Sequence, residues 1–262
     1  MKHLILCILS LITSIGIISA QQYDGMTGLI HVPSAEMDTV GQVRLGAHYL
    51  DGNMTPDHRY WMDNGKKYNT GSIYMSITPF SWMEIGYTMI IFKVTDTEYV
   101  HDKNGYNRKD RHFSVKFRPL KEGKYWPSVA IGAADFLNSD FLKNSPNDDT
   151  SHTSNDFFRC FYLTLSKGFE FSGNRISATA AYRTYTADYN HRWQGVVGGV
   201  VWHPWFARGH KLLSDMRVIA EWDGCEVNCG IDVTLWRHFI LQASLQNGHN
   251  PSAGLCYTVN LF

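Results

Sequence analysis

The sequence lacks the features that a helical membrane protein or a nucleic-acid-binding protein would need. After residue 20, no apolar stretch approaches the roughly 20 residues of a membrane-spanning helix, so any passage through a membrane would be by strands. Net charge is also absent, since 24 basic residues balance 24 acidic ones. This balance indicates no strong attraction to nucleic acid or to a charged membrane surface. Proline is scarce, with 8 residues against 22 glycines, which suits strands and turns.

Catalytic and metal-binding motifs are missing as well. The sequence has no GxSxG, HExxH or CxxC motif and no glycine-rich phosphate loop, so we expect no enzymatic activity, no metal site and no cofactor. Cysteines are few. Cys225 and Cys229 flank a tight hairpin and are candidates for a disulfide, because an exported protein folds in an oxidising compartment. Unpaired cysteines that act as small apolar residues are the alternative.

What the sequence has in abundance, from residue 42 to the end, is alternation of apolar and polar residues. Apolar residues occupy the odd positions 227–235, and polar or small residues lie between them. A period of two predicts strands with one apolar and one polar face. Most predicted strands have the length at which a tilted strand crosses a bilayer. Twelve are expected, at 42–50, 69–78, 83–93, 111–119, 127–136, 157–167, 175–186, 195–203, 214–223, 226–236, 238–247 and 252–262.

The connections between the first six predicted strands alternate in length. Those at 51–68, 94–110 and 137–156 are long and polar, whereas those at 79–82 and 120–126 are short. Outer-membrane barrels have this asymmetry between their two ends. Tryptophans at or near the even-numbered connections would form an interfacial girdle at one end, although large aromatic residues capping a soluble barrel are the alternative. These tryptophans are Trp82, Trp126, Trp202, Trp205 and Trp236.

The alternation also assigns side chains to the two faces of the barrel. Residues such as Leu45, Leu241 and Val259 are expected to face lipid, where a charge near the midplane would cost about 2–4 kcal/mol. Polar residues on the opposite face would line a conduit for an anionic glycan or pair with one another and close the lumen. Pairing is favoured because buried charges need partners. The lumen candidates are Arg44, His48, Glu84, Lys116, Arg118, Arg183, Glu221 and Asp232.

The N-terminal region has no such alternation. Residues 1–20 carry a short positive start, an apolar run and a small-residue cleavage site, which predicts a secretory signal peptide; an uncleaved anchor is the alternative. Residues 21–41 are rich in turn-forming residues. We expect this lead-in to stay in the periplasm or to fold into the mouth of the barrel.

Three segments resemble the YjbH-like exopolysaccharide biosynthesis family: 28–35 followed by Gly41, 79–85, and 122–136. The resemblance implies an outer-membrane β-barrel linked to exopolysaccharide or capsule export, with polysaccharide and other envelope export proteins as partners. It supplies no catalytic residues, and this chain is shorter than typical members and lacks a lipobox. The family-motif residues are Gly28, Leu29, Ile30, Pro33, Ser34, Ala35, Tyr125, Trp126, Pro127, Asp135 and Phe136.

The predicted fold class is all-β, an antiparallel up-and-down transmembrane β-barrel of about 12 strands. The barrel would span 42–262, after a signal peptide at 1–20 and a lead-in at 21–41. We expect a non-enzymatic component of exopolysaccharide or capsule export or assembly, in contact with outer-membrane lipid in a Gram-negative bacterium. Two alternatives are an outer-membrane enzyme acting on lipid or glycan and a soluble secreted carbohydrate-binding β protein, whose apolar residues would point inward.

Overall fold

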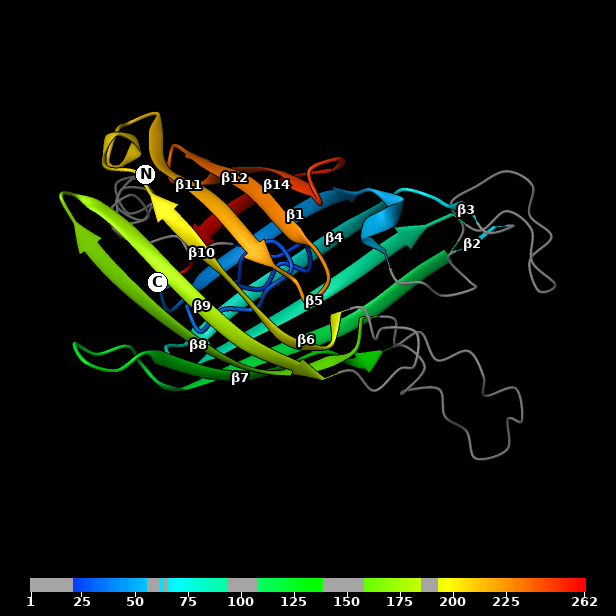
Figure 1. Ribbon diagram of the computed structural model, residues 1–262, viewed down its shortest axis with the longest axis horizontal. Helices are drawn as coiled ribbons and strands as arrows, with labels where there is room; N and C mark the ends of the chain where they lie inside the picture. The colour runs from blue at the N-terminus through cyan, green and yellow to red at the C-terminus, as the bar shows by residue number, and fades with distance from the viewer. Residues whose placement is uncertain (1–20, 56–61, 64–65, 94–107, 139–157, 185–192) are drawn as a thin grey trace, which may run out of the picture.

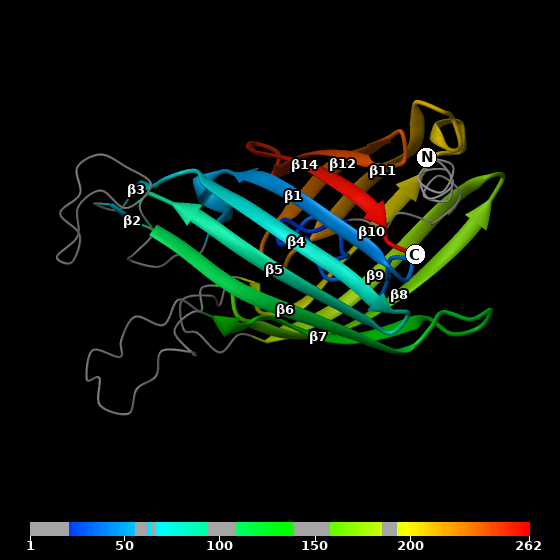
Figure 2. The same cartoon turned by 180° about the vertical axis from the view of Figure 1, so that it is seen from behind.

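Twelve strands close into one antiparallel barrel in the computed structural model (Figures 1 and 2), which describes residues 21–55, 62–63, 66–93, 108–138, 158–184 and 193–262. Each barrel strand pairs with its neighbour along the chain, and the last strand closes on the first. The strands are β1 (Gln42–Leu50), β4 (Thr70–Phe80), β5 (Met83–Phe92), β6 (Arg108–Leu120), β7 (Ser128–Asn138), β8 (Cys160–Phe171), β9 (Asn174–Thr184), β10 (Gly195–His203), β11 (Leu213–Trp222), β12 (Val227–Leu235), β13 (Phe239–Gln246) and β14 (Asn250–Asn260).

The predicted fold class and strand number are confirmed. Val43 at the closing seam lies opposite both Val259 of β14 and Ile77 of β4. The largest boundary difference is at the end of β8, which reaches Phe171 instead of residue 167. Four short elements within the described residues were not predicted. Two are the strands β2 (Met62–Asp63) and β3 (Lys66–Lys67), which pair only with each other, and two are the 3-10 helices η1 (Gly52–Met54) and η4 (Trp205–Ala207).

Large apolar side chains cover the outside of the barrel. Leu45 and Leu241 are 56% and 45% exposed, and burial alternates strictly along β13. The largest fully buried side chains instead include Arg44, Lys116 and Arg217. A soluble protein rarely exposes large contiguous apolar patches. This inverted distribution is what a lipid-facing barrel requires.

The two ends of the barrel differ. The short hairpins β4–β5, β8–β9 and β12–β13 lie at the same end as the C-terminus, at the left of Figure 1. The tryptophans at or beside the connections of this end are exposed, namely Trp82, Trp126, Trp202, Trp205 and Trp236. Among them, Trp82 stacks between Phe80 and Phe117. The arrangement matches that of an aromatic girdle at a membrane interface.

The lead-in (residues 21–41) lies inside the barrel, between its opposite walls (Figures 1 and 2). It begins with two tight turns, closed by the bridges Gln21 to Thr27 and Gly28 to Pro33. Hydroxyl groups of the wall donate to its backbone: Ser72 Oγ lies 2.7 Å from the carbonyl oxygen of Tyr23. The sequence left open whether the lead-in stays in the periplasm or folds into the mouth of the barrel, and in the structure it lies between the opposite walls of the barrel.

Inward-facing glycines give lumen side chains the room to lie flat against the wall. A Cβ at Gly254 would overlap the imidazole of His48, and a Cβ at Gly46 would overlap the phenol of Tyr74. Gly71 has no such neighbour, since a Cβ there would meet nothing within 4 Å. Glycine at the first two positions is therefore a packing requirement.

The sequence left two alternatives for Cys225 and Cys229, a disulfide or no pairing, and the structure does not join these two exposed residues. Cys229 lies on the outward face of β12, whereas Cys225 belongs to the preceding turn, where its N–H donates to Asp223 Oδ1 at 2.9 Å. The two cysteines therefore lie in different places, Cys229 on the outer wall of the barrel and Cys225 in the turn.

No helix within the described ranges is long and apolar enough to cross a membrane. The predicted signal peptide, residues 1–20, lies outside the described residues.

Candidate functional site: the filled lumen

The lumen is the candidate functional site, because the charged side chains of the barrel wall meet the lead-in there. Seven of the eight predicted lumen residues are buried, and Arg118 is half-buried at the end of β6, where it donates to the Ser81 carbonyl oxygen at 2.6 Å. The buried seven are Arg44, His48, Glu84, Lys116, Arg183, Glu221 and Asp232.

Glu221 of β11 receives a turn of the lead-in. The Ile30 N–H donates to Oε2 at 2.9 Å, the His31 N–H to Oε1 at 2.9 Å, and the Val32 N–H to Oε2 at 3.2 Å. The amide of Asn228 donates to Oε1 at 3.1 Å. Successive backbone N–H groups that converge in this way form an anion-binding concavity, so the carboxylate fixes the position of this turn.

Glu84 and Lys116 hold a second point of the lead-in. Glu84 Oε1 accepts the Thr27 N–H at 2.8 Å, and Oε2 lies 2.7 Å from Lys116 Nζ. Lys116 also donates to the Thr27 carbonyl oxygen at 2.9 Å. Both backbone groups of one lead-in residue are therefore bound by a buried ion pair, an arrangement that compensates for the burial of both charges.

The remaining lumen charges also have partners. Arg44 forms a bidentate pair with Asp38 of the lead-in, with Nε–Oδ2 and Nη2–Oδ1 distances of 2.5 and 2.6 Å. Arg183 donates to the carbonyl oxygens of His31, at 3.0 Å, and Asp223.

Asp232 pairs with Arg217 at 2.5 Å, and His48 hydrogen-bonds to Gln242. Arg217 was missed in the sequence analysis, although it shares the inward face of β11 with Glu221.

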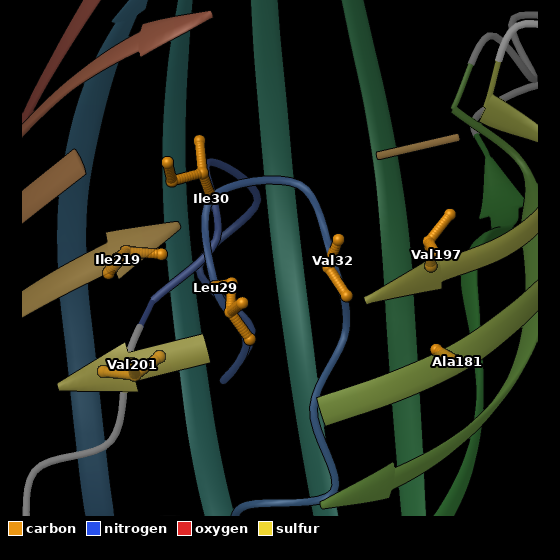
Figure 3. Packing of buried hydrophobic residues seen from close by; sticks show 7 residues of the cluster. All are labelled: Leu29, Ile30, Val32, Ala181, Val197, Val201 and Ile219. Atoms are coloured by element: carbon orange, nitrogen blue, oxygen red, sulfur yellow. The ribbon is translucent and has the colours of Figure 1, made fainter. Parts of the chain in front are cut away.

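An apolar patch inside the lumen packs against the lead-in. Leu29, Ile30 and Val32 form one buried cluster with four residues of the wall (Figure 3). Burying a side chain of this size contributes about 1.5–3 kcal/mol. The sequence carries one indication of this apolar patch, because β10 has valines on both of its faces. One set faces lipid, and the other contacts the lead-in. The wall residues are Ala181, Val197, Val201 and Ile219.

Two carboxyl groups outside the strands have shifted pKa values. Burial raises the pKa of Asp24, against the opposing effect of the Met26 N–H. Burial acts in the same direction on Asp223, but the charge of His31 and hydrogen bonds from the turn outweigh it and leave the pKa of Asp223 lowered. Within the lead-in and its anchoring turns, Asp24 is therefore the carboxyl that burial makes easier to protonate.

The family-motif residues lie in three places. The lead-in holds Gly28, Leu29, Ile30, Pro33, Ser34 and Ala35, where the Ala35 N–H donates to Ser166 Oγ at 2.9 Å. Tyr125, Trp126 and Pro127 belong to the β6–β7 hairpin, and Tyr125 is 81% exposed. Asp135 is buried in β7, and the neighbouring Phe136 is half-buried. The motifs therefore correspond to the lead-in and to a hairpin that packs beside it, since Ser128 Oγ donates to the Ala35 carbonyl oxygen at 3.0 Å.

The YjbH family, described as "exopolysaccharide biosynthesis protein YbjH", matches residues 19–262. A search of curated proteins gives no match. Among solved structures, an outer membrane channel from Pseudomonas putida F1 is similar at 13% identity and a TM-score of 0.41, over 86% of this chain and 97% of that one. A triple-mutant porin from Rhodopseudomonas blastica has 8% identity and a TM-score of 0.26, over 83% of this chain and 98% of the porin.

Proposed function

Because the chain belongs to the YjbH exopolysaccharide biosynthesis family, we propose that it is a non-enzymatic outer-membrane barrel that serves in exopolysaccharide or capsule export or assembly. The observation that carries the proposal is the inverted distribution of side chains. Apolar residues such as Leu45 and Leu241 face outward, and charges such as Lys116 are fully buried around the lead-in. Outer-membrane lipid is the solvent that suits this exterior.

The resting lumen is closed by the lead-in. Three independent anchors hold it, at Thr27, at the Ile30–Val32 turn and at Asp38. All three are polar contacts between the lead-in and the wall, and water or a hydroxylated ligand offers the same hydrogen bonds. Passage of a polymer would therefore require displacement of the lead-in rather than unfolding of the barrel.

The surface beneath the lead-in is suited to a glycan. The wall groups that now bond the lead-in backbone include Ser72, Ser76, Thr88 and Thr164, whose hydroxyls lie 2.7–3.0 Å from its carbonyl oxygens. On displacement these hydroxyls would face sugar hydroxyls, and the cations of the lumen would face any acidic sugar. This chemistry favours a polysaccharide over an apolar solute.

Placement in the membrane is tested by fractionating cells and running the membrane fraction on a gel with and without boiling. An intact barrel migrates differently before heating, and we expect that shift in the outer-membrane fraction. Recovery of the protein in the soluble periplasmic fraction, with no heat-dependent mobility, would reject the placement.

The role in export is tested separately, by measuring secreted and cell-bound polysaccharide in a strain that lacks the protein. We expect the secreted amount to fall and to return when the wild-type chain is supplied. Unchanged polysaccharide in that strain, together with normal assembly of the supplied barrel, would reject the role and leave the membrane placement intact.

A further inference from the structure

Three buried side chains near one end of the lumen face one another. Asp110 and His112 lie on β6 and Asp135 on β7, and each is at most 1% exposed. His112 Nδ1 lies 3.3 Å from Asp110 Oδ2 and 4.0 Å from Asp135 Oδ1. One ligand atom from each residue lies within 4.8 Å of the other two. None of the three anchors the lead-in through a hydrogen bond described above.

A β-bulge brings Asp135 into this group. The pairing of β6 with β7 shifts between Phe113, opposite Leu137, and Val115, opposite Ala133. Asp135 lies in this interval with φ of 51°, a left-handed conformation that aspartate tolerates better than most residues. Bulges redirect side chains, and here the result is a carboxylate buried in the lumen.

The carboxylate of Asp110 independently indicates a ligand in this group of side chains. Within the described part of the chain, its Oδ1 is buried and accepts no hydrogen bond. A buried carboxylate oxygen without a donor calls for a partner such as an ion or an ordered water. Beside His112 is a cavity of about 20 Å³ that Asp24 and Ser114 also line. This is room for about one water molecule.

We propose that Asp110, His112 and Asp135 bind a divalent transition-metal ion, with water completing its coordination. Two carboxylates and one imidazole are ligands for Zn²⁺ or Mn²⁺, whereas Mg²⁺ and Ca²⁺ prefer oxygen alone. Separations of 3.3 and 4.0 Å suit ligands held about 2.0–2.2 Å from a shared ion. The ion would join β6 to β7 and, through the Phe158 N–H that donates to Asp135 Oδ2 at 3.0 Å, to the start of β8.

The test uses the full chain, assembled in detergent, purified without a histidine tag and stripped with EDTA. Zn²⁺ or Mn²⁺ is then titrated, and binding is followed by calorimetry and by the change in Tm. We expect one ion per chain and a higher Tm with either metal, and neither effect with Mg²⁺. Asp110→Asn and Asp135→Asn should each weaken binding at least tenfold; asparagine also tolerates the left-handed backbone at residue 135.

Two controls make the outcome decisive. His48→Gln removes a buried lumen histidine outside the group and should leave binding unchanged, and heat-dependent gel mobility shows that each variant is folded. Three binding results would overturn the proposal: no binding by the folded wild-type chain, equal binding by folded Asp135→Asn, or binding that disappears only when the exposed Cys225 and Cys229 are replaced by serine. A fourth result would also overturn it: if Asp135→Asn lowers Tm equally with and without metal, the group is an ion pair and not a metal site.

Discussion

Replacing Glu221 by glutamine should release the Ile30–Val32 turn from the barrel wall. The carboxylate accepts from four groups: three backbone N–H groups and the Asn228 amide. A glutamine keeps one acceptor oxygen and turns an NH₂ toward donors that it cannot satisfy. At most two or three of the four contacts can survive, and those that do are no longer charge-assisted.

The size of the effect follows from these contacts. Loss of two charge-assisted hydrogen bonds costs about 3–6 kcal/mol at roughly 1.5–3 kcal/mol each. Asn228 keeps its existing hydrogen bond to Asp223 Oδ2, at 3.0 Å. Relaxation of the turn toward the acceptor oxygen that glutamine retains offsets part of the loss and leaves about 2–4 kcal/mol. Since about 1.4 kcal/mol is a factor of ten, local opening of the turn should become about 30- to 700-fold more frequent.

Amide hydrogen exchange of a peptide covering the Ile30–Val32 turn measures this opening directly. The matched control is Glu122→Gln, the same chemical change at a partly exposed hairpin residue that pairs with Lys167 at 3.1 Å and does not touch the lead-in. It should leave the exchange of the turn unchanged. Exchange in assembled Glu221→Gln within about threefold of the wild type would refute the reasoning, and uniform acceleration over all strands would indicate global destabilisation instead.

Three further substitutions test the walls of the barrel. Ile231→Arg places a charge on the outward face and should cost about 2–4 kcal/mol near the midplane, seen as loss of the heat-modifiable band; normal assembly would contradict the assigned face. Gly254→Ala should lower stability by about 1–3 kcal/mol through overlap with His48, whereas Gly71→Ala should have little effect, and equal denaturation midpoints would disprove this packing. Asp232→Asn leaves a buried arginine without its carboxylate and should cost about 3–5 kcal/mol; an unchanged midpoint would show that the ion pair is not stabilising.

The position of the lead-in could not be read from the sequence, because its anchors use the backbone. Glu221 binds three N–H groups, and every residue except proline has such a group. The apolar contacts of the lumen were hidden for a related reason. Valines on both faces of β10 do not reveal which set faces lipid and which faces Leu29.

Metal-ligating residues were missed because the usual spacing motifs are absent. Asp110 and His112 are two residues apart on one strand, so they share a face, but nothing in the sequence places Asp135 beside them. The register shift between β6 and β7 does so. A bulge depends on the pairing of two strands, and sequence alternation alone assigns the wrong face on one side of it.

The sequence by itself determined the strands and their two faces, because side-chain direction alternates locally along an extended chain. It did not determine which face points outward, because a soluble barrel would turn its apolar residues inward. The closed barrel decides this, since Ile231 and Leu241 are exposed around a polar interior. Only the tertiary structure decided what fills that interior. Closure of β14 on β1 brings distant walls around the lead-in, and charges separated by up to 191 residues from their partners meet because burial without a partner would be too costly.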